Sequence, residues 1–580
     1  MASSEDERDS GRSADNWRDT HADTPAGAAA TLERRDFLKV AGAAAALGSA
    51  ALRPASLGTA AFGVTTGAAL ASPLAGALIS PAQQTPLPPL GNGEAPALTF
   101  QAYPGGTGAL MERLWREHGE RLFERAPIEI APWEGPVPTS EDDIAFLPVG
   151  RLAALVRERR ITSGELTEIY LSRLRRYDPV LLCAVTILEE RARAEARLAD
   201  EEIAAGRWRG PLHGIPYGVK DLFSVAGAPT TWGSADFAGR VIDEDAEVVV
   251  RLREAGAVLI AKLATGEFAR GDQWYRGRTL NPWNVAEGSS GSSAGPGSAT
   301  AAGCVAFAIG TETRGSIVSP ARRTGLSALR PTFGRVSRHG GMVLAWSMDK
   351  VGPLCRTIED CALVFGSIHG ASELDPASLT TPFAFERAPD LAALRIGFTE
   401  DAPESFLRVL TELGANPRPM SPLPLGRFDQ LGAESAAAFD FYVAPGGAEP
   451  APLPADLSTA ERGRLSRFRD GRDVRGFDYL NAQRRRLLLM REMVESMRGF
   501  DMFVTGSGEV ALTNDTGHPA VVLAYDFGVR NPEEASPTTM PLTTVIVGDL
   551  FADDRILSVA HAYQAVTNWH LRRPDLSALG

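Results

Sequence analysis

Between residues 214 and 309, short apolar segments alternate with an amphipathic one, and this alternation restricts the possible folds more than any other feature of the chain. The segments 214–221, 257–261 and 305–309 are short and largely apolar, which is typical of buried strands. The pattern over 244–255 predicts a helix. A strand, a helix and further strands in succession indicate an α/β sheet. The chain has 580 residues, 44% of them hydrophobic, which suffices for a large core.

The segments on either side carry further local signals. The pattern predicts an amphipathic helix over 110–123 and a helical region throughout 147–204. Within that region, Thr162 and Glu165 have the spacing of a capping box. A strand is expected over 394–398, and a basic amphipathic helix over 478–497. Residues 299–302 are expected to begin a helix.

Charge and cysteine content exclude some classes of function. The formal net charge is −13, which argues against broad nucleic-acid binding because such binding needs a basic face. Four cysteines in so long a chain do not make a disulfide framework, and no Cys-x-x-Cys pair or His/Cys cluster suggests a metal site. We therefore expect small buried residues at Cys183, Cys304, Cys355 and Cys361.

The beginning of the chain has the features of an export signal. The first 32 residues are polar and rich in charge, which predicts disorder. Arg34-Arg35-Asp36-Phe37-Leu38-Lys39 then precedes a mildly apolar stretch over 40–52, a pattern that resembles a twin-arginine signal. This stretch is too short and too weakly apolar for a stable membrane span. Ala69-Leu70-Ala71 resembles a cleavage site.

These observations divide the chain into three parts. We predict a disordered region with a twin-arginine signal peptide over 1–71, a Pro/Gly-rich linker over 72–97 and one domain over 98–580. The predicted location is the periplasm or cell envelope, or the medium after secretion. The alternative for residues 34–52 is a short amphipathic helix at a domain edge.

Residues 288–298 form a Gly/Ser-rich segment inside the α/β pattern. A flexible linker is the simplest interpretation, but periodic segments continue on both sides of it. Such a loop opening a helix exposes N–H and hydroxyl groups to an anion or oxyanion. Gly291-Ser-Ser-Ala-Gly295 also fits the nucleophile elbow of α/β-hydrolases, which needs a strand directly before it and a later histidine. Turn residues 281–284 precede it instead, although later histidines exist at His518, His561 and His570.

Three segments together resemble the amidase signature family. Gly-Ile-Pro-Tyr-Gly-Val-Lys-Asp over 214–221 is similar to the lysine strand of the family. Asn-Pro-Trp-Asn over 281–284, followed by Gly-Ser-Ser-Ala-Gly over 291–295, is similar to its Ser-rich loop. Gly-Thr-Glu-Thr-Arg-Gly-Ser-Ile over 310–317 is similar to its nucleophile turn. The number of residues between these three segments also agrees with the family. The resemblance is strong over about 142–370 and resumes at 514–520 and 547–551.

The resemblance implies a Ser-Ser-Lys triad, with Ser316 as nucleophile, Ser292 as proton relay and Lys220 as base. A serine hydroxyl attacks poorly unless a base removes its proton. Lysine can act as that base only when neutral, so its pKa must fall by roughly three units from about 10.4, which burial can achieve. Lys220 ends an apolar strand, so burial is expected. In this family the bridging serine follows a cis peptide bond.

The oxyanion would be held by backbone N–H groups of the turn, at Thr313, Arg314, Gly315 and Ser316. The residues expected to shape the Ser-rich loop and contact the substrate are Gly291, Ser293 and Gly295. The chain departs from the family at Arg314, where glycine is usual, at Glu312, where Asp is usual, and at Ala294, where Gly is usual. Arg314 would either crowd the turn or attract an acidic group of a substrate. His213 is expected to be structural and Asp221 to cap the turn after Lys220.

The fold class implied by the resemblance is α/β, with a mixed central sheet covered by helices on both faces. The implied activity is hydrolysis of a carboxamide C–N bond through a serine acyl-enzyme, with a small-molecule amide as partner, no nucleic acid, and neither cofactor nor metal. We expect a monomer or homodimer. Two alternatives remain: an amidotransferase subunit of a cytoplasmic complex, and a catalytically impaired exported protein that binds amides. The substrate is not specified, because the acyl pocket is expected to draw on variable regions that include 375–475.

Overall fold

The computed structural model describes residues 103, 106–123, 127–425, 432–443, 459–529 and 538–579. The predicted signal peptide over 1–71, the linker over 72–97 and the beginning of the domain at 98 lie outside the described residues. These three assignments stay predictions.

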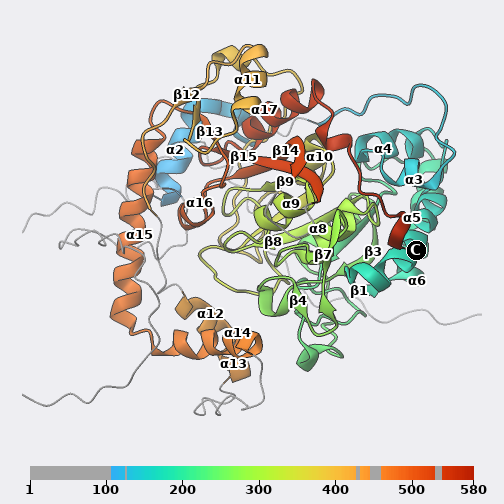
Figure 1. Ribbon diagram of the computed structural model, residues 1–580, viewed down its shortest axis with the longest axis horizontal. Coiled ribbons are helices and arrows are strands. Elements are labelled where there is room, and N and C mark those ends of the chain that lie inside the picture. Colours follow the sequence, from blue (N-terminus) through green and yellow to red (C-terminus); the bar gives the residue numbers. More distant parts are fainter. Residues whose placement is uncertain are drawn as a thin grey trace, which may run out of the picture. The chain divides into compact units, whose positions relative to one another are not determined.

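Eleven strands form one sheet in the described part of the chain (Figure 1). In sequence order they are β1 (Ala184–Ile187), β2 (Pro216–Lys220), β3 (Val258–Leu263), β8 (Phe307–Glu312), β9 (Ser327–Arg330), β10 (Lys350–Cys355), β11 (Ile396–Phe398), β12 (Arg418–Pro419), β13 (Met502–Thr505), β14 (Ala520–Val529) and β15 (Thr539–Gly548). Their order across the sheet is β1-β3-β2-β8-β10-β9-β14-β15-β13-β11-β12.

The sheet is mixed, as predicted. β2 pairs in parallel with β3 and β8, and β11 pairs in parallel with β12 and β13. The other neighbouring strands are antiparallel. Two short antiparallel ladders lie outside this sheet and consist of β4 (Gln273–Trp274) with β5 (Gly277–Arg278), and β6 (Leu280–Asn281) with β7 (Asn284–Gly288).

The helices of the described residues connect these strands. They are α2 (Gly106–His118), α3 (Glu141–Ala145), α4 (Val149–Arg157), α5 (Ser163–Leu181), α6 (Glu189–Ala204), α7 (Glu247–Glu254), α8 (Ala294–Ala301), α9 (Val318–Thr324), α10 (Ile358–Ile368), α11 (Glu404–Glu412), α12 (Gly432–Ala438), α13 (Asp440–Val443), α14 (Thr459–Asp470), α15 (Gly476–Ser496), α16 (Val510–Thr516) and α17 (Asp553–Ala565). The predicted capping box at Thr162 and Glu165 is present at the start of α5.

Apolar side chains bury both faces of the sheet. Successive residues of a strand point to opposite faces. In β14, Val521 and Leu523 join an apolar cluster that includes residues of α10 and α17, whereas Ala520 and Val522 join a second cluster with residues of α9 and α15. Helices therefore cover both faces, as the fold class requires.

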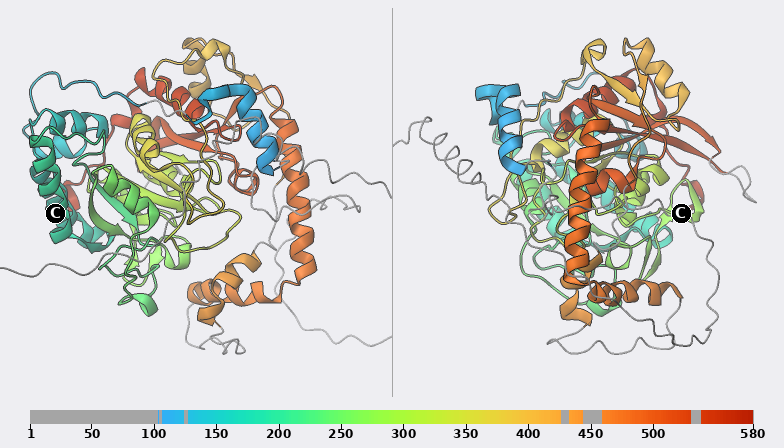
Figure 2. Two further views of the ribbon diagram at one scale, coloured as in Figure 1. Left: turned by 180° about the vertical axis from the view of Figure 1, so that it is seen from behind. Right: turned by 90° about the vertical axis from the view of Figure 1, so that its left-hand side faces the viewer.

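Helix α15 runs along one edge of the described chain in the left view of Figure 2, and down the middle of the picture in the right view. Its buried residues include Ala482, Arg486, Leu489 and Met493, which recur at intervals of three and four along one face. The predicted basic helix over 478–497 is thereby confirmed with slightly different bounds. None of the described helices combines the length and apolar character that crossing a membrane requires.

Two local predictions were wrong. The region 147–204 is not helical throughout, because β1 (Ala184–Ile187) interrupts it and forms the edge of the sheet next to β3. The helix expected to begin at 299–302 already begins at Ala294, directly after the Ser-rich loop. Gly295, Pro296 and Gly297 suggested a loop there, but the first helical turn tolerates proline and this one is fully buried.

Candidate active site

Lys220 is the last residue of β2, and its side chain is fully buried. Its Nζ lies 2.9 Å from the Oγ of Ser292 and 2.9 Å from the Oγ1 of Thr311. Burial lowers the pKa of Lys220 to about 7, against an opposing influence of the carboxylates of Asp349 and Glu312. An amine that is partly neutral near pH 7 can accept a proton from the hydroxyl beside it.

Ser292 lies in the loop that leads from β7 into α8. The peptide bond between Gly291 and Ser292 is cis, in agreement with the resemblance. A side chain at Gly291 would overlap the carbonyl oxygen of Gly271, and a side chain at Gly295 would overlap the backbone of Ala264. The strand before Ser292 is β7, which pairs with β6 and does not belong to the central sheet. The loop therefore differs from a nucleophile elbow, which follows a strand of the main sheet.

Ser293 joins the Ser-rich loop to the turn that carries Ser316. The Ser293 N–H donates to the carbonyl of Ser316 over 3.2 Å, and the Ser293 hydroxyl donates to the carbonyl of Thr311 over 3.1 Å. Ser316 is 8% exposed, and its hydroxyl makes no hydrogen bond to another described residue. Hydrogen bonds of catalytic groups often tighten only when a reactant binds.

The side chain of Glu312 holds the turn between β8 and α9 in place through hydrogen bonds. Its Oε2 accepts hydrogen bonds from the N–H groups of Ile317, over 2.7 Å, and Val318, over 2.8 Å. Its Oε1 accepts from Arg330 over 3.1 Å and from Asn514 over 2.7 Å. Burial by itself raises the pKa of Glu312, but Arg330 and these donors hold it below its ordinary value. Glu312 thus remains a hydrogen-bond acceptor, and because it is the last residue of β8, its carboxylate links the β8 end of the turn to the α9 end.

The turn itself presents backbone donors. Gly315 has a φ of +94°, and a side chain there would approach the Oγ of Ser319 within 2.9 Å. This positive φ favours glycine. The N–H groups of Gly315 and Ser316 donate to none of the described residues. Paired N–H groups next to a nucleophile are the usual elements of an oxyanion hole.

Arg314 points to a carboxylate of the protein. Its Nη2 lies 2.8 Å from the Oδ1 of Asp515, which is fully buried in α16, while the Arg314 side chain is 34% exposed. Two roles were expected for Arg314, crowding of the turn or attraction of an acidic group of a substrate. In the structure, an internal carboxylate already pairs with this guanidinium.

A cavity of about 450 Å³ adjoins Thr311 and Thr313. Asp349 lines this cavity and accepts a hydrogen bond from the Thr313 hydroxyl over 2.6 Å. The second oxygen of Asp349 accepts from the N–H groups of Leu344, over 2.7 Å, and Ala345, over 3.0 Å. Asp349 therefore connects the loop that lines the cavity to the turn that carries Ser316.

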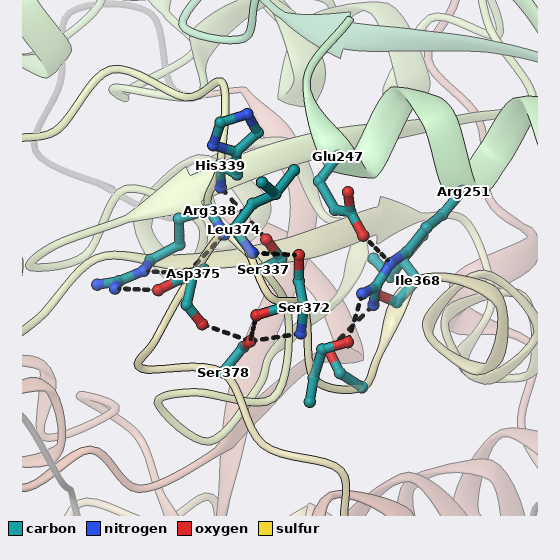
Figure 3. Close-up of polar contacts among 12 residues, drawn as sticks. Glu247, Arg251, Ser337, Arg338, His339, Ile368, Ser372, Leu374, Asp375 and Ser378 are labelled. Atoms are coloured by element: carbon teal, nitrogen blue, oxygen red, sulfur yellow. Dashed lines mark hydrogen bonds and ion pairs between the residues drawn. The ribbon is translucent and has the colours of Figure 1, made fainter. Parts of the chain in front are cut away.

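Arg338 and Asp375 also line this cavity, and Figure 3 shows the polar contacts around them. Arg338 binds Asp375 through two bonds of 2.8 Å. The N–H of Ser372 donates to the hydroxyl of Ser378 over 2.8 Å and closes the segment that carries Asp375. Part of the acyl pocket was expected from the region 375–475, and among the described residues of that region only 375–377 line this cavity.

Several residues around the predicted triad had no assigned role in the sequence. Thr311 and Asp349 contact the triad or the turn through side-chain oxygens, and Asn514 and Asp515 reach the turn from a distant part of the chain. Thr311 lies inside the recognised segment 310–317 and Asp349 inside the family-like stretch 142–370, but no sequence pattern indicates which side chains they contact. The segment 514–520 was recognised as family-like, which was the one available signal for the last two.

The other titratable residues singled out by sequence have structural partners. Asp221 forms a fully buried ion pair with Lys262 at 2.7 Å and accepts the N–H of Thr231 over 3.0 Å, so it does more than cap a turn. His213 lies 3.2 Å from Glu202.

None of the three later histidines contacts Ser292. His518 is buried against the Thr516 hydroxyl at 2.8 Å, whereas His561 and His570 line a separate cavity. The four cysteines are buried and free. Among the described residues, no three His, Cys, Asp or Glu side chains are grouped as metal binding would require.

Comparisons with known proteins agree with this geometry. A family model described as Amidase matches residues 165–514. A glutamyl-tRNA(Gln) amidotransferase subunit of Methylococcus capsulatus is 32% identical over 491 residues, which cover 73% of this chain and 98% of that protein. The protein AmiD of Mycobacterium tuberculosis is 33% identical over 480 residues, covering 75% and 97% of the two chains.

Solved structures show the same similarity. The native peptide amidase of Stenotrophomonas maltophilia superposes with a TM-score of 0.63 and 27% identity, over 74% of this chain and 98% of that chain. A bacterial aryl acylamidase of the amidase signature family shares the fold, with a TM-score of 0.64 at 21% identity over 74% and 98% of the two chains. The chain therefore belongs to the amidase signature family and is an amidase that acts on amide C–N bonds.

Proposed function

We propose that this enzyme cleaves a small-molecule amide by means of Ser316, Ser292 and Lys220. The observation that carries the assignment is the 2.9 Å contact between the buried Lys220 amine and the Ser292 hydroxyl. The pKa of Lys220 is lowered to about 7, so a substantial fraction of the amine is neutral at that pH.

The steps follow from these positions. Neutral Lys220 draws the proton of Ser292 as Ser292 takes that of Ser316, and the Ser316 oxygen attacks the amide carbon. The N–H groups of Gly315 and Ser316 stabilise the negative charge that develops on the carbonyl oxygen, and those of Thr313 and Arg314 complete the proposed donor set. Ser292 then gives a proton to the departing nitrogen and regains one from the Lys220 ammonium, so that ammonia or an amine leaves and Lys220 is neutral again. Water hydrolyses the acyl-enzyme through the same relay and releases the carboxylate.

The cavity beside Thr311 and Thr313 is an argument that the substrate is a small molecule. Its volume of about 450 Å³ falls in the usual range for ligand pockets, and it is lined by both apolar and charged residues. We propose that one side of the substrate lies there, and that Gly291, Ser293 and Gly295 shape the side formed by the Ser-rich loop. A panel of aliphatic, aryl and peptide amides, assayed for release of ammonia or amine, tests the proposal. Hydrolysis by wild type but not by Ser316→Ala supports it, and equal hydrolysis by both refutes it.

An amidotransferase subunit is the second candidate, because proteins of that kind align over nearly their whole length. The predicted export signal argues against it, since a secreted protein does not meet a cytoplasmic complex. Purified protein that hydrolyses amides without any partner supports the amidase. Activity that appears only with a glutamyl-tRNA partner complex supports the alternative.

We also propose export by the twin-arginine pathway. The motif at Arg34 and Arg35 with the apolar stretch behind it supports this. Replacing both arginines by lysine should retain the protein in the cytoplasm of its host, whereas unchanged export would refute the proposal.

A further inference from the structure

Two consecutive residues of α16 hold the turn that carries Ser316. Asn514 donates to Glu312 over 2.7 Å, just before the turn, and Asp515 pairs with Arg314 at 2.8 Å, within it. Asp515 is itself fixed, because the Nε of Arg486 on α15 donates to its carbonyl over 2.6 Å. The contacts therefore run from α15 through α16 to the proposed oxyanion donors.

The positive charges around Asp515 favour a carboxylate at this position. Arg486 is buried and its guanidinium interacts repulsively with that of Arg314. Lys350 is also buried and interacts with the Asp515 carboxylate. Asp515 lies among these cations and pairs with Arg314. The Arg314 side chain is 34% exposed, so without this carboxylate we expect the repulsion from Arg486 to turn it toward solvent and away from α16.

If the Arg314 side chain moves and its backbone shifts with it, the proposed oxyanion donors, the N–H groups of Gly315 and Ser316, move as well. Gly315 and Ser316 come directly after Arg314, and Glu312 holds the N–H groups of Ile317 and Val318 on the far side. A displacement of about 1 Å at a reacting group can lower a rate on the order of 100-fold. The cavity lies beside Thr311 and Thr313 and is not lined by Asp515.

We propose that Asp515 is a positioning residue for the oxyanion turn, which it holds in place through the side chain of Arg314. The inference rests on the proposed function, because it assumes that Ser316 is the nucleophile. It explains how this chain uses an arginine at a position where the family resemblance leads us to expect glycine. Asp515 does not touch the reacting atoms and acts only through Arg314.

The test uses a fluorophosphonate probe, which reacts with an activated serine and needs no knowledge of the natural substrate. The full-length protein is titrated with probe to separate the maximal labelling rate, kinact, from the apparent affinity, KI. The variants are Asp515→Asn, Arg314→Gly and the two combined. The matched control is Asp245→Asn, because Asp245 is also a largely buried carboxylate that binds an arginine, Arg191, at 3.3 Å.

We expect Asp515→Asn to lower kinact about 10- to 100-fold with KI changed less than about twofold. In the Arg314→Gly background the same substitution should change kinact less than about twofold, because no guanidinium remains to be placed. The control should keep the wild-type kinact. Equal losses from Asp515→Asn in both backgrounds would show a general structural role and overturn the proposal, as would a wild-type kinact in Asp515→Asn.

Arg314→Lys provides a second test if Asp515→Asn does not fold. The shorter side chain keeps its charge but reaches Asp515 only by pulling on the turn, so a reduced kinact is expected. A wild-type kinact in Arg314→Lys would overturn the proposal. A wild-type protein that takes no label at Ser316 would overturn the proposed function together with this inference, whereas normal labelling of wild type with unchanged variants would overturn the inference alone.

Discussion

The amine of Lys220 and the hydroxyl of Ser292 lie 2.9 Å apart in a place that solvent hardly reaches, with exposures of 0% and 1%. Burial disfavours the charged amine and so produces the neutral base that the proposed mechanism needs. The same burial opposes folding, because a lysine that is charged in the unfolded chain must lose its proton on folding.

The first prediction concerns the pH dependence of the reaction. The pKa of Lys220 is about 7, and only the neutral amine can accept a proton. We expect kcat/KM to rise through pH 7 and to fall about tenfold for each pH unit below about 6. A pH profile measured with any hydrolysed amide checks this. A profile that is flat between pH 5 and 9 would contradict the role of Lys220 as base.

The second prediction concerns stability. Lys220→Met should abolish hydrolysis and raise the Tm at pH 7, because methionine has no charge to lose in the buried site. The shift of the Lys220 pKa from 10.5 to about 7 corresponds to roughly 5 kcal/mol, and loss of the Lys220 hydrogen bonds to Ser292 and Thr311 offsets about half of it.

The sign of this effect depends on pH. The folded-state pKa of Lys220 lies below the unfolded value of 10.5, so the folded protein binds fewer protons between about pH 7 and 10.5. The free energy of unfolding of the wild type therefore increases relative to that of Lys220→Met as the pH rises from about 7 to 10.5. Calorimetry at pH 7 and pH 9.5 should show the advantage of Lys220→Met shrinking at the higher pH. An advantage that grows with pH would refute the assignment.

The third prediction concerns Asp349. Its carboxylate raises the pKa of Lys220, although burial has the larger and opposite effect. Asp349→Asn should therefore lower the pKa of Lys220 further and move the acid limb of the pH profile to lower pH. The plateau rate should also fall, because the carboxylate binds Thr313 and the cavity loop. An acid limb that moves to higher pH would count against this account of the site.

The fourth prediction concerns the Ser-rich loop. Gly291→Ala places a methyl group onto the carbonyl oxygen of Gly271, so the loop must shift. We expect loss of fluorophosphonate labelling and a destabilisation on the order of 2 kcal/mol or more. The control is Gly239→Ala, where nothing lies within 4 Å of the added atom. If the two variants label equally, the close packing of this loop is irrelevant to catalysis.

Short-range patterns predicted much of the α/β core. β2, β3 and β8 lie where apolar runs were recognised, and α7 and α15 lie where helical periodicity was recognised. The edge strand β1 was missed because it lies between two long helices and has only four residues, which are too few to establish an alternating pattern. The start of α8 was misplaced because its glycines and proline favour loops unless buried packing compensates.

The predicted site residues come from three segments that the fold brings together at Lys220, Ser292 and Ser316. What the sequence did not predict are contacts between elements far apart in the chain, such as that of Arg314 with Asp515, 201 residues later. Side-chain identity alone does not determine which carboxylate an arginine meets, because the choice depends on how α16 packs beside the turn.

The most direct test of the central claim is to map a covalent adduct. Full-length protein is treated with a fluorophosphonate, digested and analysed by mass spectrometry. The account predicts one adduct on the peptide that contains Ser316, its disappearance in Ser316→Ala, and a labelling rate lowered at least about 100-fold in Lys220→Met. An adduct on another serine, or labelling of Ser316→Ala at the wild-type rate, would contradict it.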